Sequence, residues 1–414
     1  MKIKHTMQAL KKIFTLWQST NLMIKILIGI VLGATLALLC PNLSGIGILG
    51  TLFVGALKSI APLLVGILVI GSIAKAGPGL GGRFRTVVSL YIISTLLAAV
   101  VAVVISMTFK VEIALVQVTD IGKNAPEALS DIFSKIVMNI FINPITALAQ
   151  ANYLSILFWA LIIGLALKKV ASEQTIKSLN HLSDAVSKVV SWIIQCAPFG
   201  ILGLVLTSVA ESGIEIFTTY GKLLLVLIGC MLAVPLIIHP LLIGFMIKGN
   251  PYPLIWKCLK ESGISAFFTR SSAANIPVNL ELCKRMGIDE DFYSVSIPLG
   301  STINMNGAAI TITVMTLATC YTLGITPDLG SALLLSIIAT LGACGASGIA
   351  GGSLLLIPMA CSLFGIGNDI SMQVVAVGFI IGVIQDSVET ALNSSGDAMY
   401  TIAAELHERR KSKE

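Results

Sequence analysis

Polar side chains recur at helical spacing in the last apolar stretch of the chain, at Asp386, Glu389, Thr390, Asn393 and Asp397. These positions are i, i+3, i+4, i+7 and i+11, and at about 100° per residue they share one side of a helix. Carboxylate and amide oxygens suit an ammonium group or a small hard cation. Inside a bilayer each charge costs roughly 2.5–3.5 kcal/mol unless it is paired or hydrated, so this stripe predicts a functional site.

The composition is that of a membrane protein. Of 414 residues, 56% are hydrophobic and 12% are charged, about half the charged fraction of a soluble domain. Apolar runs near the length needed to cross a bilayer recur along the chain. The net charge of +6 comes from Lys and Arg residues dispersed between these runs. They indicate membrane topology and no nucleic-acid partner, and they predict cytoplasmic termini with an even number of crossings.

Two apolar segments are interrupted in the middle by small and polar residues. Residues 255–280 are broken at "TRSSAAN" and residues 331–364 at "GACGASGIAGGS". Each is followed by a predicted long helix that carries polar residues, over 294–323 and 372–404. Paired interruptions of this kind are typical of inverted-repeat transporters. Because lipid cannot satisfy the freed backbone groups, we expect two re-entrant hairpins around a wet cavity; Gly-rich loops between short spans are the alternative.

Arg270 lies in the first interruption, beside Ser271 and Ser272. A guanidinium at depth needs a carboxylate, which Asp386, Glu389 or a substrate could supply. Backbone N–H groups at the broken tips, with the two serine hydroxyls, offer an anion site. The sequence therefore predicts that anion-binding and cation-binding groups share one cavity, as a zwitterion carried with an ion requires.

The chain resembles the sodium:dicarboxylate symporter family, the glutamate and neutral amino-acid transporters. The resemblance spans nearly the whole chain and is specific at "TRSSAANIPV", "PLGSTINMNGAA", "GASGIAGGS" and "DSVETALNSSGD". Within the family, the chain is most similar to members that import serine and threonine by symport with Na⁺. Another neutral or acidic amino-acid symporter and an ion-conducting channel are the alternatives.

The resemblance implies an all-α membrane protein with eight transmembrane helices, two re-entrant helical hairpins, inverted repeats and elevator-type alternating access. It also implies a homotrimer in the inner (plasma) membrane, with the second hairpin as the extracellular gate. The expected parts are cytoplasmic termini at 1–20 and 406–414, scaffold spans at 21–84 and 110–215 with an external loop, and transport-domain segments at 85–109 and 216–405.

The resemblance also implies roles for individual residues. Asp386 would hold the substrate ammonium, whereas Asn393, Ser272 and the backbone of Ile349–Gly351 would hold its α-carboxylate. The expected substrate site further includes Arg270, Ser271, Ala308, Glu389 and Thr390. One Na⁺ would be bound by Asn304, Asn393 and Asp397, and another by Thr302, Met305 and backbone of the second hairpin.

Three departures from the family pattern bear on specificity. Where acidic-substrate members have an Arg, this chain has Glu389, and where they have a Thr it has Ala308. The added anion should repel aspartate and glutamate and favour small neutral side chains. Asn306 replaces an Asp that elsewhere joins an ion site, which favours a lower Na⁺ coupling ratio.

We expect no enzyme activity and no bound cofactor other than the co-transported Na⁺. The eight cysteines contain no CxxC pair and the four histidines are scattered. Asp386 and Asp397 would lie about 16 Å apart along one helix, too far to act on one bond. Asp397 has an alternative position in the cytoplasm, a few turns before the charged tail.

Overall fold

The computed structural model describes residues 20, 22–40, 44–75, 81–115, 141–213, 216–346 and 351–411. All regular elements within these ranges are helical. Residues 116–140 of the external loop expected over about 109–145, Ile349, residues 1–19 and residues 412–414 lie outside the described residues.

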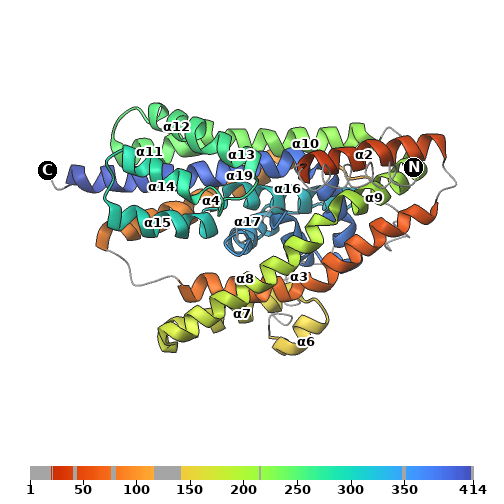
Figure 1. The fold of residues 1–414 in the computed structure, drawn as a ribbon, viewed down its shortest axis with the longest axis horizontal. Helices are drawn as coiled ribbons and strands as arrows, with labels where there is room; N and C mark the ends of the chain where they lie inside the picture. The colour runs from red at the N-terminus through yellow and green to blue at the C-terminus, as the bar shows by residue number, and fades with distance from the viewer. Residues whose placement is uncertain are drawn as a thin grey trace, which may run out of the picture.

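One group of helices packs around α3 and α9. Helix α2 lies against α9, and α3 contacts α7, α8 and α9 (Figure 1). Helices α8 and α9 meet at a bend of 51°. The group contains α2 (Leu22–Leu39), α3 (Ile48–Lys75), α6 (Pro144–Ala149), α7 (Tyr153–Val170), α8 (Glu173–Gln195) and α9 (Ala197–Ser212).

A second group packs around α19 (Asn368–Lys411), which runs along the long axis of the molecule (Figure 1). Helix α4 contacts α10, α15, α16, α17 and α19. The other members are α4 (Gly81–Thr108), α10 (Ile216–Ala233), α11 (His239–Ile247), α12 (Tyr252–Cys258), α13 (Ile264–Thr269), α14 (Ile276–Arg285), α15 (Glu290–Ile303), α16 (Asn306–Thr322), α17 (Leu329–Ala343) and α18 (Ile357–Ser362). Short π or 3₁₀ turns at Val234–Ile238, Leu259–Gly263 and Ser353–Leu356 join α10 to α11, α12 to α13 and the second interruption to α18.

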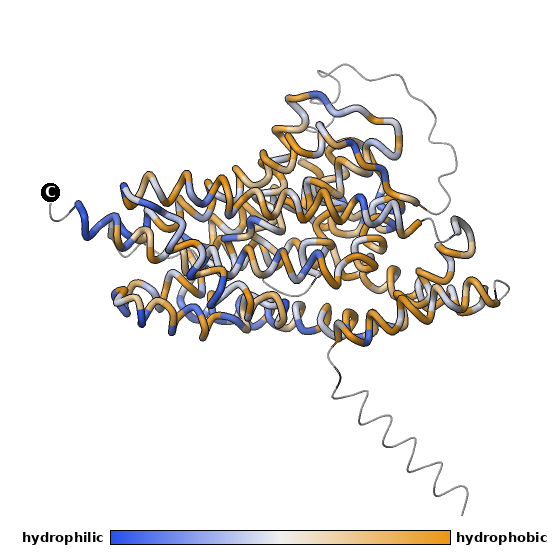
Figure 2. Tube along the Cα trace, turned by 90° about the horizontal axis from the view of Figure 1, so that it is seen from above, coloured by the Kyte–Doolittle hydropathy of each residue, from blue (hydrophilic) through white to orange (hydrophobic). Residues whose placement is uncertain are grey.

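The protein is a multi-pass membrane protein. Among the described residues, five helices are long and apolar enough to cross a bilayer, or up to six if α8 and α9 form one bent span. Apolar residues cover the body of the bundle, and hydrophilic residues gather at the end near the C-terminus (Figure 2). Exposed apolar side chains recur along α10 and α11, for example Leu225 and Phe245, which are 72% and 76% exposed, and they suit contact with lipid rather than water.

Both predicted interruptions are present. Helix α13 ends at Arg270, whose backbone is left-handed with φ of 51°, and α14 begins six residues later at Ile276 with Pro277 in its first turn. This Pro lacks an N–H group, so it suits a helix start and not a continuing helix. Helix α17 ends at Ala343, and a helical turn resumes at Ser353.

The helix expected over 294–323 is not continuous, because Asn304 and Met305 leave helical geometry. Asn304 has φ of −91° and ψ of 78°, and Met305 has φ of −118° and ψ of 52°. Asparagine side chains form hydrogen bonds that compete with a helix. The Asn304 amide instead bonds to α19, so the break turns its side chain toward α19.

Charged side chains join three elements at the end of the bundle near the C-terminus. Arg83 of α4 donates to Glu405 of α19 at 2.8 Å and to Asp289, which precedes α15, at 3.0 Å. The Arg83 hydrogen bond lowers the pKa of Asp289. Arg409 also donates to Glu405, at 2.8 Å. The Glu405 side chain is only 4% exposed, so these arginines neutralise a nearly buried charge.

We expect Arg83→Met to lower the free energy of unfolding by about 1–3 kcal/mol, because it leaves a nearly buried carboxylate with one fewer donor. Thermal unfolding in detergent, followed by circular dichroism, measures the change. Arg285→Met is the matched control, since Arg285 is 53% exposed where it pairs with Glu261, and surface pairs contribute little. Equal midpoints for the two variants would contradict the prediction.

Candidate functional site

The predicted polar stripe of α19 is buried inside the bundle, where both interrupted segments meet it. Asp386 is 2% exposed, Glu389 5%, Asn393 3% and Asp397 0%. All four lie within one uninterrupted helix, as the spacing predicted. Asp397 is buried in the protein and not exposed to solvent.

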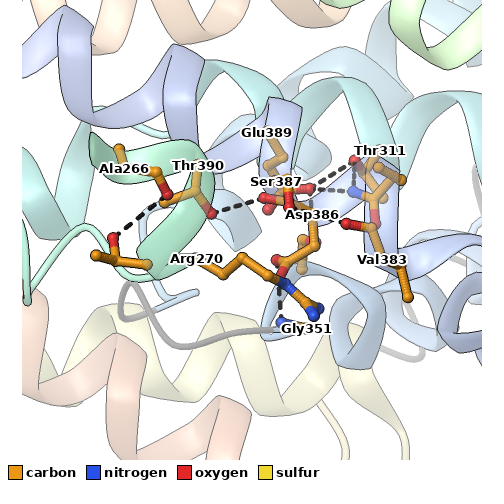
Figure 3. A network of polar contacts seen from close by, with 12 residues as sticks. Ala266, Arg270, Thr311, Gly351, Val383, Asp386, Ser387, Glu389 and Thr390 are labelled. Atoms are coloured by element: carbon orange, nitrogen blue, oxygen red, sulfur yellow. Dashed lines mark hydrogen bonds and ion pairs between the residues drawn. The ribbon is translucent and has the colours of Figure 1, made fainter. Parts of the chain in front are cut away.

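Asp386 joins the two interruptions through its two carboxylate oxygens. Arg270 of the first interruption donates through Nε to Asp386 Oδ2 at 2.6 Å. The backbone N–H of Gly351, in the second interruption, donates to Asp386 Oδ1 at 3.1 Å. Figure 3 shows the Arg270 side chain extending toward Asp386, with Gly351 beside it. Of the partners that the sequence left open, Asp386 is therefore the carboxylate that pairs with Arg270.

Glu389 lies one turn further along α19 and has different partners. Its Oε2 atom accepts hydrogen bonds from Thr311 of α16 at 2.7 Å and from Ser353 at 2.9 Å. Gln385 donates to the same oxygen from one turn earlier on α19. Figure 3 shows Thr311 on the side of α19 away from Arg270. Sequence reasoning did not identify these three donors.

The break at Asn304 assembles an oxygen-rich cluster with α19. Asn304 Nδ2 donates to the backbone oxygen of Asn393 at 3.0 Å and to Asp397 Oδ1 at 2.9 Å. Asn393 Oδ1 accepts from the N–H of Gly307 at 2.7 Å. Asp397 Oδ2 is buried and has no hydrogen-bond partner among the described residues. This free carboxylate oxygen suits a small cation, which prefers oxygen ligands.

The remaining expected ion-site residues have protein partners. Asn393 Nδ2 donates to Met305 Sδ at 3.5 Å, and the Thr302 hydroxyl donates to the Leu299 carbonyl within its own helix at 2.7 Å. Thr302 therefore lies just before the break and Met305 lies within it, and of these two residues only Met305 bonds to α19 in the described part of the chain.

Asn306 forms a second cluster with residues that sequence reasoning missed, and Ser94 joins it to the first cluster through a hydrogen bond to Asn304 Oδ1 at 3.4 Å. Its Oδ1 accepts from the hydroxyls of Ser94 and Thr95 on α4, at 3.0 and 2.9 Å. Its Nδ2 donates to Nε2 of His239, at 3.2 Å. His239 is fully buried and its ring packs edge-to-face on Tyr400. Ser94 and Thr95 could have been identified from the sequence, because they are two neighbouring hydroxyl residues within the apolar run of α4.

The other expected substrate-site residues are near neighbours in sequence of the residues described above. Ser272 is 2% exposed at the tip of the first interruption, and Ser271 Oγ accepts from the N–H of Ala274. Thr390 donates to the backbone oxygen of Asp386 at 2.7 Å. Ala308 is fully buried beside Gly307.

Glycines allow α15 and α16 to approach α19 at the polar residues. A Cβ at Gly307 would lie 2.9 Å from Glu389 Cα, and one at Gly396 would lie 2.6 Å from Asn304 Nδ2. A Cβ at Gly300 would lie 2.9 Å from Asp397 Oδ1. These separations are shorter than van der Waals contact, so the close packing needs residues without a Cβ.

Comparison with known proteins gives a consistent match along the chain. A profile of the sodium:dicarboxylate symporter family matches residues 22–406. A protein of Bifidobacterium adolescentis named serine/threonine transporter SstT is 53% identical over 405 residues, covering 97% of this chain and 93% of that protein. Proteins with the same name from Streptococcus agalactiae and Streptococcus thermophilus are 53% and 51% identical, covering 96% and 97% of this chain and 98% and 100% of their own.

We expect Gly307→Ala to lower the free energy of unfolding by about 1–3 kcal/mol, because the new methyl group would separate α16 from α19. The loss should exceed the gain in helix propensity, which is at most about 1 kcal/mol. Gly382→Ala is the control on α19, since a Cβ there meets nothing within 4 Å. Thermal unfolding in detergent should show a lower midpoint for the first variant only, and an unchanged or higher midpoint for Gly307→Ala would contradict the close-packing argument.

Proposed function

Because this chain belongs to the sodium:dicarboxylate symporter family, we propose that it imports serine and threonine by symport with Na⁺. The chain is a transporter and not an enzyme. The names of the relatives support the substrates, since about half of all positions are identical over nearly the full length. The observation that carries the proposal is the buried meeting point of Asp386, Arg270 and Gly351 between the two interruptions.

The substrate ammonium binds Asp386 in this proposal. Asp386 is a buried carboxylate that is paired with a cationic group, Arg270, and an ammonium would take the place of that partner. Asn393, Ser272 and the backbone that ends at Gly351 bind the α-carboxylate. Ser271 and Thr390 complete this part of the site.

Sodium is carried as a second substrate. Asn304, the Asn393 carbonyl and Asp397 form one site, which the unpartnered Asp397 Oδ2 supports. Thr302 and Met305 contribute to another. Asn306 is neutral, and its amide is occupied on both sides by Ser94, Thr95 and His239. That arrangement supports a coupling ratio lower than in members with an Asp at this position.

The transport movement divides the molecule into two parts. The helices that pack on α3 and α9 serve as a scaffold, and those around α19 move across the membrane as an elevator with the substrate. Sparser packing between the two groups than within them supports this division. Eight spans, two re-entrant hairpins, a homotrimer in the inner membrane and cytoplasmic termini complete the proposal. The corresponding ranges are 21–84 and 110–215 for the scaffold and 85–109 and 216–405 for the transport domain.

Purified protein in proteoliposomes tests the function. An inward Na⁺ gradient should drive accumulation of radiolabelled L-serine, with L-threonine as a competitor and L-glutamate without effect. We expect Asp386→Asn to abolish this uptake, because the neutral amide no longer binds the ammonium as an ion pair. Asp369→Asn, in the exposed first turn of the same helix, should retain it. Normal serine uptake by Asp386→Asn would refute the assignment.

The double variant Glu389→Arg with Ala308→Thr tests charge selectivity. Replacing an anion with a cation, and adding a hydroxyl, should shift competition from serine toward aspartate and glutamate by at least tenfold. Competition assays with the four unlabelled amino acids measure the shift. A double variant that still accepts only serine and threonine would show that these positions do not set charge selectivity.

A further inference from the structure

The hydrogen bonds to Glu389 are concentrated on one of its two oxygens. Thr311, Ser353 and Gln385 all donate to Oε2. Oε1 accepts no hydrogen bond from any residue in the part of the chain that the structure describes. The residue is nevertheless only 5% exposed. The carboxylate is therefore held from three elements while one oxygen remains available.

Gln385, on the same side of α19, provides a second acceptor atom without a donor, in addition to Glu389 Oε1. Its Nε2 donates to Thr311 Oγ1 at 2.7 Å as well as to Glu389. Its Oε1 is buried and has no partner within the described ranges. A buried acceptor without a donor is destabilising, because it has lost its hydrogen bonds to water. Both available atoms are acceptors, so the group that completes this cluster has to be a hydrogen-bond donor.

We infer that Glu389 recognises the side-chain hydroxyl of the substrate, with Oε1 as the acceptor. This inference rests on the proposed function and deepens it. Asp386 and Glu389 are i and i+3, so their side chains start roughly 5–6 Å apart on one helix face. In serine and threonine, three bonds separate the ammonium nitrogen from the hydroxyl oxygen. A small amino acid whose ammonium binds Asp386 therefore presents its hydroxyl toward Glu389.

Thr311, Ser353 and Gln385 are positioning residues in this arrangement. They fix Oε2, so that the carboxylate does not rotate and Oε1 keeps its direction. Gly307 adds to this by packing directly against the Glu389 backbone and side chain. A site built around a substrate hydroxyl discriminates against the analogue that lacks it, because the acceptor is then left unpaired. The inference therefore predicts a preference for serine over alanine that needs no difference in pocket size.

The test compares each hydroxyl amino acid with its analogue lacking the hydroxyl. KM values for Na⁺-driven uptake of L-serine and L-alanine, and of L-threonine and L-2-aminobutyrate, are measured in proteoliposomes. We expect Glu389→Gln to raise KM for serine and threonine roughly tenfold or more, because a charge-assisted hydrogen bond becomes a neutral one. KM for the two analogues should change by less than about twofold.

Thr311→Val tests the positioning role with a change that preserves shape. We expect a several-fold rise in KM for serine and no change for alanine, since only the hydroxyl that orients Glu389 is lost. Thr319→Val is the matched control on the same helix, because the Thr319 hydroxyl donates to its own helix at Met315. This control should leave both KM values unchanged.

The outcomes separate the inference from the proposed function. Absence of Na⁺-driven serine uptake by the wild-type protein would refute the function itself. Active wild-type protein together with equal losses for serine and alanine in Glu389→Gln would refute the hydroxyl-binding role alone. If Glu389→Gln transports neither amino acid, the Thr311→Val variant provides the test. An unchanged ratio of the serine KM to the alanine KM in Thr311→Val would then overturn the inference.

Discussion

The site depends on the cost of leaving charges and backbone polar groups unsatisfied inside an apolar helix bundle. The Arg270–Asp386 ion pair avoids this cost for two charges, because each charge is the partner of the other. It also ties the left-handed end of α13 to α19, and the Gly351 N–H ties the second interruption to the same carboxylate. A single buried aspartate thus holds together three segments that are far apart in the sequence. In the proposed function, the substrate binds where these contacts already balance charge.

Close helix packing makes this arrangement possible. Gly300, Gly307 and Gly396 bring α15 and α16 against α19 at the points where Asp397, Glu389 and Asn304 lie. Asn304 then reaches the α19 backbone because the helix is interrupted beside it. Backbone breaks and glycines, which have no side chain, therefore have the same effect. Both bring oxygen atoms together inside the membrane.

Two clusters of similar residues have different electrostatic character. Around Asp397, a carboxylate oxygen has no protein partner within the described ranges, which suits a cation. Around Asn306, a neutral amide is bonded to two hydroxyls and an imidazole, so its oxygen and nitrogen are already in use. The first cluster therefore contains a buried carboxylate, whereas the bonds of Asn306 are hydrogen bonds of a neutral amide.

The sequence by itself determined the membrane class, the two interruptions and the polar face of α19, because composition, Pro and Gly positions and helical periodicity are local properties. It also identified the family through short motifs. Tertiary structure alone decided that Arg270 pairs with Asp386 and not Glu389, and that Thr311, Ser353 and Gln385 converge on Glu389. It also placed the helix break at Asn304, where the side chain gains partners on α19. These choices depend on which helices pack together, and no periodicity within one segment encodes its contacts with another.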